Sequence, residues 1–237
     1  MDRHEGVHQA RKSLRRARAI LALARPGPGS RAEVLSAAIG RLCRGLSALR
    51  DAQALLEILA RFGQAGAEVP AMLPDAIAAA QAQRDSVLER FLRRDPGLLA
   101  RRQRIAGFRA QLDRLDWTRR GDDAVARAMA RSLRRARKAG RRARKQPQDS
   151  QAWHRFRRRL RRLHQQNTVL AELAPELRLK APALEQQARA LGEAQDCLLL
   201  LARCAGRSPF AAALRPALRR LARQRLQQIR HDRPGEQ

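Results

Sequence analysis

The sequence predicts an all-α protein, and three observations support that prediction. Alanine and leucine dominate a chain that is 44% hydrophobic, whereas the β-branched residues that favour strands are scarce. No segment alternates apolar and polar residues with the period of two that is typical of a half-buried strand. Proline and glycine recur between segments of helical periodicity, which indicates helices joined by short turns.

Four helices are predicted in the first half of the chain. RPGPGS ends the first helix, and Ser30 is placed to cap the second, which is long. The loop GQAGAEVPAMLP follows, and Pro74 or Asp75 opens the third helix. A break at DPG separates the third helix from the fourth. The expected ranges are 4–24, 30–62, 74–94 and 98–115.

Four more helices are predicted in the second half. The turn DWTRRGDD offers Asp122 or Asp123 as a cap for the fifth helix, and QPQDS ends it. Asp149 or Ser150 is expected to cap the sixth. The last two helices begin at prolines. The expected ranges are 122–145, 149–173, 182–205 and 209–230, so about eight helices are expected in all.

An internal repeat organises the chain. A shift of 146 residues superimposes VHQARKSLRRARA on WHRFRRRLRRLHQ, and a shift of 145 superimposes LSALRDAQALL on LGEAQDCLLLL. The interpretation is a single domain, 1–237, made of two similar antiparallel helical bundles, 1–146 and 147–237. The matched pairs are His8 and His154, Arg11 and Arg157, Lys12 and Arg158, Leu14 and Leu160, Arg15 and Arg161, Arg16 and Arg162, Asp51 and Asp196, and Leu55 and Leu200.

The charge points to a polyanionic partner. The chain has 51 lysines and arginines against 22 acidic residues, a net charge of +29, and such a surplus repels itself in the folded state. Nucleic acid, an anionic membrane surface and a phosphate polymer are the candidates. With no tyrosine and 3% aromatic residues, the chain has little on which to stack bases. Its preference for arginine suits bidentate contacts with phosphate oxygens.

Three predicted helices carry cations on one face. On a helical wheel, His8, Arg11, Lys12, Arg15 and Arg18 oppose an apolar face, and the sixth helix repeats this with His154, Arg157, Arg158, Arg161 and His164. The stripe on the fifth helix is Arg127, Arg131, Arg134, Lys138, Arg141 and Lys145, about 27 Å long. An ordinary solvated face is the alternative. Such faces mix signs, however, and this stripe loses roughly 1–2.5 kcal/mol without a counterion.

The remaining signals exclude several classes of function. Cys43, Cys197 and Cys204 form no Cys-x-x-Cys pair and are interpreted as reduced apolar residues. No metal-ligand spacing, nucleotide-binding loop or nucleophile motif is present, so neither a metal, a cofactor nor an enzymatic activity is expected.

The chain shows no signal peptide and no apolar run of membrane-spanning length, so it is expected to be cytoplasmic. His4 and His231 are assigned to the terminal surface.

Two interpretations of Asp51 and Asp196 stay open. Each could form a salt bridge on a helix face, or each could orient a basic side chain that reaches the ligand.

The paired segments resemble the CHAD family, the conserved histidine α-helical domain. The resemblance is carried by VHQARKSLRRARA and WHRFRRRLRRLH, each followed by a Leu-x-x-x-x-Asp segment, and it extends over about residues 5–230. It implies two four-helix bundles related by pseudo-twofold symmetry, with a basic groove between them. It also implies non-catalytic binding of inorganic polyphosphate and association with polyphosphate granules. The Glu-x-Glu-x-Lys signature of a fused hydrolase domain is absent, so the chain resembles a stand-alone form.

The chain departs from the family pattern at His164 and Gln165, where a basic residue and an aromatic are usual, and at Gln195, which matches Arg50 of the first copy. We therefore expect the second repeat to bind less tightly. The alternative function is sequence-nonspecific nucleic-acid binding, which rests on net charge alone. The residues expected to bind polyphosphate are His8, Arg11, Lys12, Arg15, Arg16, Arg18, Arg131, Arg134, Lys138, Arg141, His154, Arg157, Arg158, Arg161 and Arg162.

Overall fold

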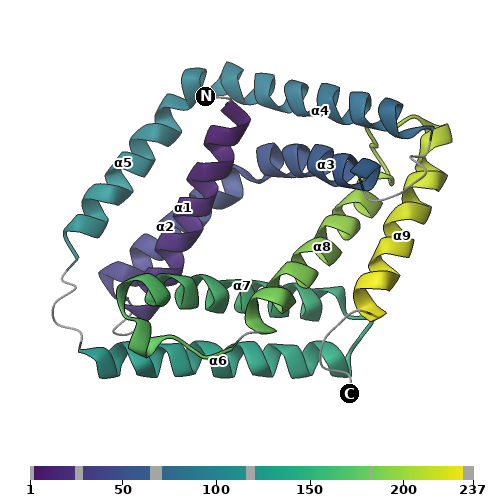
Figure 1. Cartoon of the computed structure of the whole chain (residues 1–237). Coiled ribbons are helices and arrows are strands. Elements are labelled where there is room, and N and C mark those ends of the chain that lie inside the picture. Colours follow the sequence, from purple (N-terminus) through teal and green to yellow (C-terminus); the bar gives the residue numbers. More distant parts are fainter. Residues whose placement is uncertain (1–2, 25–28, 65–70, 116–120, 182, 232–237) are drawn as a thin grey trace. The chain divides into compact units, whose positions relative to one another are not determined.

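The computed structural model describes residues 3–24, 29–64, 71–115, 121–181 and 183–231, and within these ranges it is all-α, as predicted (Figure 1). It contains nine α-helices, three short 3-10 helices and no strand in the part of the chain that it describes. The elements are α1 (Arg3–Leu23), α2 (Arg31–Gly45), α3 (Ser47–Gln64), α4 (Leu73–Arg94), η1 (Pro96–Leu98), α5 (Leu99–Asp113), α6 (Asp122–Lys145), α7 (Ser150–Leu173), η2 (Pro175–Leu177), α8 (Ala183–Arg203), η3 (Ala212–Leu214) and α9 (Arg215–His231).

The single long helix predicted over 30–62 is wrong, because the chain breaks between α2 and α3. Gly45 ends α2, Leu46 forms a turn and Ser47 starts α3. Glycine is a weak helix former and commonly marks a helix end, while Leu46 is 2% exposed and so gains burial at the break. The helical spacing of apolar residues continues through the break, so periodicity alone predicts one helix there.

Several predicted helix starts are confirmed by their capping contacts. The Ser30 hydroxyl accepts a hydrogen bond from the Glu33 amide at 3.2 Å. The Asp149 carboxylate accepts from the amides of Gln151 at 2.8 Å and Ala152 at 3.0 Å, which satisfies two free donors of α7. At α6 the N-cap is Gly121, which provides no side-chain cap, and the two predicted aspartates lie in the first helical turn.

The chain forms two compact units that are interleaved in sequence. The first unit comprises Met1–His8, Gly45–Arg102 and Ala190–Gln237, and the second comprises Gln9–Arg44 and Gln103–Arg189. Each unit therefore takes segments from both sequence repeats, and the division into repeats 1–146 and 147–237 stays a prediction.

The core of the first unit combines α3, α4, α8 and α9. Leu55 and Leu200, which the repeat matches to each other, are 1% and 0% exposed in the same apolar cluster. Phe210, Leu218 and Ala222 join this cluster from the C-terminal end of the chain. Burying one such large side chain stabilises the fold by about 1.5–3 kcal/mol.

His4 was assigned to the terminal surface, and that assignment is wrong. Its side chain is 5% exposed, and its Nε2 lies 4.0 Å from Asp85 Oδ1. Because α1 already begins at Arg3, His4 falls one helical turn before the buried Val7 and shares its inward face. The side chain of His231 lies outside the described residues.

The second unit is built around α6 and α7, which lie side by side (Figure 1). Ala136 and Ala143 of α6 are buried, and Gly140 between them permits close packing. A Cβ at Gly140 would lie 3.0 Å from Cε2 of Phe156 in α7. Gln166 of α7, fully buried, donates a hydrogen bond to the Ala19 carbonyl of α1 at 3.0 Å and so ties these two helices together.

Candidate functional site

A cleft of about 560 Å³ opens in the second unit between α1, α6 and α7. Nine arginines and one lysine line it, and no carboxylate does among the residues that the structure describes. We call it the arginine cleft. Its lining consists of Arg15, Arg18, Arg135, Lys138, Ala139, Arg142, Ala152, Arg155, Arg158, Arg159, Arg161, Arg162 and Gln165.

Helical spacing explains why these side chains converge. On α6, Arg135, Lys138 and Arg142 lie at i, i+3 and i+7, on one face. On α7, Arg155, Arg158 and Arg162 follow the same spacing. The opposite faces of both helices bury small or apolar residues, so packing directs these cations toward the cleft.

α1 completes the cleft with Arg15 and Arg18, one helical turn apart. The hydrogen bond between Gln166 and Ala19 holds α1 against α7. An ion pair between Arg16 and Glu172 links the same two helices at the surface. These contacts fix the spacing between the two helices that carry the matched arginines.

The cleft concentrates positive charge enough to perturb its own arginines. Burial, followed by the nearby charges of Arg18, Arg159, Arg135 and Arg158, lowers the pKa of Arg162 to about 10. Burial, with the charges of Arg135 and Arg158, also lowers the pKa of Arg159. With a pKa of about 10, Arg162 remains protonated at neutral pH, and the repulsion among these arginines favours an anion in the cleft.

The cleft brings together six of the residues predicted to bind polyphosphate: Arg15, Arg18, Lys138, Arg158, Arg161 and Arg162. Arg15 and Arg161 are equivalent positions of the two repeats, and the structure places them in one lining. Arg18 and Arg162 are half-buried, whereas Lys138 and Arg158 are exposed.

The other predicted residues lie outside this lining. His8 belongs to the first unit. Arg11 donates a hydrogen bond to the Cys43 carbonyl, and Arg16 is ion-paired with Glu172. The remaining predicted residues are exposed or half-buried on α1, α6 and α7, and they are Lys12, Arg131, Arg134, Arg141, His154 and Arg157.

Sequence reasoning missed four cations of the lining, Arg135, Arg142, Arg155 and Arg159. On α6 the wheel selected Arg131, Arg134 and Arg141 because they form the most continuous stripe. Arg135 and Arg142 form a second stripe, one residue and therefore about 100° further around the helix. The packing of α7 against α6 determines which cations of α6 face the cleft, and Lys138 of the predicted stripe is one of them.

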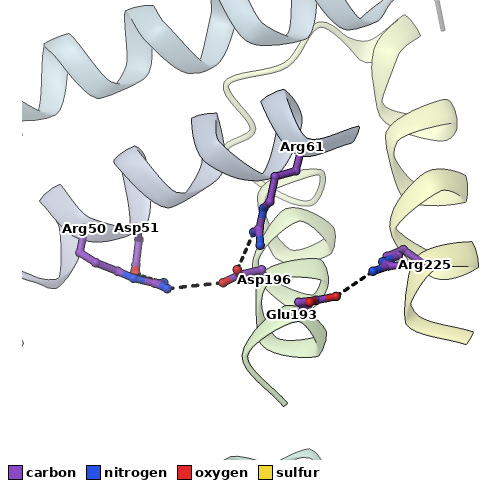
Figure 2. A network of polar contacts seen from close by, with 6 residues as sticks. All are labelled: Arg50, Asp51, Arg61, Glu193, Asp196 and Arg225. Atoms are coloured by element: carbon purple, nitrogen blue, oxygen red, sulfur yellow. Dashed lines mark hydrogen bonds and ion pairs between the residues drawn. The ribbon is translucent and has the colours of Figure 1, made fainter. Parts of the chain in front are cut away.

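A second polar cluster lies in the first unit, between α3 and α8 (Figure 2). Arg50 donates to Asp51 at 3.2 Å and to Asp196 at 3.4 Å, and Arg61 donates to the other Asp196 oxygen at 2.7 Å. Both aspartates therefore form salt bridges, as one interpretation of the sequence predicted. Whether they also orient arginines for a ligand stays a prediction.

The three cysteines are free thiols and buried. Burial, and then the charge of Asp196, raises the pKa of Cys197 to about 11. Among the described residues, no group of three or more His, Cys, Asp or Glu side chains is placed to hold a metal ion. In the same ranges, no helix combines the length and the apolar character needed to cross a membrane.

Comparison with known proteins identifies one family. A family model described as CHAD domain matches residues 1–205. Comparisons with curated proteins and with solved structures give no match.

Proposed function

This chain belongs to the CHAD domain family, and we propose that it binds inorganic polyphosphate without catalysing a reaction. The observation that carries the proposal is the arginine cleft, in which ten cationic side chains converge. Polyphosphate carries negative charge at every phosphate unit, and guanidinium groups match phosphate oxygens with paired hydrogen bonds.

The electrostatics of the cleft supports an extended or multivalent anion over a single small one. One phosphate ion neutralises two charges at most, whereas the lining carries ten. A polymer relieves the repulsion among many arginines at once and releases the counterions of both partners. Binding of such a ligand to the folded state alone also stabilises the fold.

The chemistry of the lining supports binding and not hydrolysis. Phosphoryl transfer in proteins normally uses carboxylates that hold metal ions or activate a nucleophile. The lining that the structure describes contains cations, two alanines and one glutamine. These groups can hold a phosphate chain, and they provide no general base at neutral pH.

The family resemblance adds finer expectations to this proposal. They are an arrangement of the two repeats as pseudo-symmetric bundles with a basic groove, and a cytoplasmic location at polyphosphate granules. The exposed basic residues outside the cleft, among them Lys12, Arg131, Arg134 and His154, would extend the path of a long polymer. Within the first unit, Asp51 and Asp196 would orient Arg50 and Arg61 for contact with a phosphate polymer.

Sequence-nonspecific nucleic-acid binding is the second candidate, and the net charge of +29 favours it. Competition separates the two functions. Polyphosphate should displace duplex DNA when both are present at equal phosphate concentration in physiological salt. Displacement in the opposite direction would favour the nucleic-acid function.

Charge reversal at the exposed rim of the cleft tests the proposal. Arg142 and Arg158 are exposed lining residues, so R142E/R158E should fold normally. Each loses a charge-assisted contact, and the affinity for long-chain polyphosphate should fall on the order of 100-fold. R220E/R223E makes the same change of charge on exposed residues of α9 and is the matched control. Equal losses in the two variants would contradict the cleft as the binding site.

A further inference from the structure

Gly40, inside α2, lies against the charged end of Arg18. A Cβ built at Gly40 would lie 3.1 Å from Cζ of Arg18, 3.3 Å from Nη2 and 3.4 Å from Nη1. The three nearest atoms all belong to the guanidinium group. The guanidinium therefore rests on the bare backbone of α2, at a place that any side chain would partly occupy.

Helix stability does not explain a glycine at this position. Gly40 is buried and has five helical residues on its C-terminal side. Glycine inside a helix costs about 0.5–1 kcal/mol relative to alanine. What the glycine provides is space, and the group that uses this space is Arg18.

Arg18 is also one of the less exposed cations of the arginine cleft. Its Nε is buried and has no hydrogen-bond partner in the part of the chain that the structure describes. Arg162 lines the same cleft from α7, and the charge of Arg18 is the foremost of the neighbouring charges that lower its pKa. Both residues line the cleft, and no described carboxylate lies between them to separate their charges.

Two neighbouring guanidinium groups without a counterion form a binding point for an oxyanion. We propose that Gly40 positions Arg18 so that Arg18 and Arg162 together bind one phosphoryl group in the inner part of the arginine cleft. The identity of this group as a phosphate of polyphosphate rests on the proposed function. The oxyanion chemistry of the pair does not depend on it. Gly40 acts through Arg18 and does not touch the ligand.

The substitution Gly40→Ala tests this proposal with little risk to the fold. The atoms that the new methyl group would meet are the end of a flexible side chain, which can shift by a few tenths of an ångström. Gly107→Ala is the matched control, because Gly107 lies inside α5 and a Cβ there would meet nothing within 4 Å. Both variants should remain folded, since alanine is the better helix former.

The readout is the dissociation constant for sodium tripolyphosphate, measured by calorimetry. We expect G40A to weaken binding about tenfold, which equals the loss of one modest charge-assisted contact. G107A should bind as the unsubstituted protein does. The Hε–Nε signal of Arg18 in an NMR spectrum should move in G40A and not in G107A, which reports the displacement directly.

A double-mutant cycle with Arg18→Gln shows whether Gly40 acts through Arg18. Glutamine ends before the guanidinium position, so R18Q removes the three atoms nearest to the methyl group of G40A, and R18Q and G40A/R18Q should bind equally. A tenfold loss that persists in the R18Q background would overturn the proposal, as would normal binding by G40A.

The outcomes also separate this inference from the proposed function. If the unsubstituted protein binds tripolyphosphate and G40A does not weaken it, the role of Gly40 is refuted and the proposed function stands. If polyphosphate chains bind no better than sulfate, yet G40A weakens sulfate binding, the oxyanion pair stands and the proposed function fails. Failure of the unsubstituted protein to bind any of these anions refutes both.

Discussion

Arg15 of α1 and Arg161 of α7 line the same cleft, although 146 residues separate them in the chain. They are the same position of the two repeats, and hydrogen bonding between α1 and α7 holds their helices together. The repeated basic segment thus supplies cations to one cleft from both α1 and α7.

The first prediction concerns this matched pair. R15Q and R161Q should each weaken polyphosphate binding about tenfold, because each removes one charge-assisted contact. The double variant should lose less than the product of the two, since both arginines face one ligand. Fluorescence anisotropy with labelled polyphosphate measures the affinities, and circular dichroism checks folding. R93Q, an exposed arginine of α4, is the control. Strict multiplicativity would argue against a shared ligand.

The second prediction follows from the pKa of Arg162, lowered to about 10. At pH 7 Arg162 is protonated with or without ligand, so Arg162 should take up no proton there. An anion raises this pKa, so near pH 10 binding should take up part of a proton. Calorimetry in two buffers of different ionisation enthalpy measures the uptake. The measurement is made in the K138R background, which replaces the lysine of the cleft lining, so that R162Q can be compared with Arg162 without that amine. Uptake that persists in K138R/R162Q would show that another group titrates.

The third prediction concerns the turn between α4 and α5. The buried Asp95 carboxylate accepts from the Ala100 amide at 2.9 Å and pairs with Arg101 at 2.5 Å. Burial raises the pKa of Asp95, but the hydrogen bonds and charge from Ala100 and Arg101 lower it by a larger amount. The resulting pKa lies below the ordinary value of 3.8. The ionised form therefore stabilises the fold above that pH, and this contribution is lost as the pH falls.

D95N should accordingly unfold at lower urea concentration than the unsubstituted protein at pH 7. The difference between the two proteins should shrink as the pH falls from 3.8 through the lower pKa of native Asp95, because both proteins then carry a neutral side chain at position 95. D113N, at the exposed end of α5, is the control. A difference that stays constant with pH would show that the charge of Asp95 contributes nothing.

The fourth prediction concerns Cys197, whose pKa is raised to about 11 by burial and then by Asp196. The thiol is neutral at pH 8, and the thiolate is the reactive form, so the native protein should resist labelling there. D196N removes the negative charge that raises the pKa of Cys197, so Cys197 should become reactive toward the label at lower pH than in the unsubstituted protein. Mass spectrometry after timed labelling measures this, with Glu193→Gln as a comparison that should have a smaller effect. Rapid labelling of the native protein at pH 8 would contradict the burial of this thiol.

The sequence was sufficient for the fold class and for most helix ends, because these depend on local chemistry. Proline, glycine and capping residues act on their neighbours, and Ser30 and Asp149 cap as expected. The break at Leu46 was missed because burial in the core decides it, and the apolar pattern reads the same through it.

The sequence predicted the basic character of the candidate site and six of the ten cations that line it. Charge and repeat selected Arg15 and Arg161, and both line one cleft; that they bind a ligand stays a prediction. The choice between two arginine stripes on α6 required the packing of α7, which local periodicity does not encode. The contact between Gly40 and Arg18 joins two helices and has no signature in the sequence.

The helix α9 lies after residue 205, where the family match ends, yet Leu218 and Ala222 are 0% exposed and Ile229 is 4% exposed in the core of the first unit. The segment that matches the family model is therefore shorter than the segment that forms the folded core of the first unit. A fragment that ends at residue 205 would lack Phe210, Leu218, Ala222 and Ile229 and would expose part of the apolar cluster that they share with α3, α4 and α8, so we expect it to aggregate. Anyone transplanting this module into another protein should carry the chain at least through Ile229.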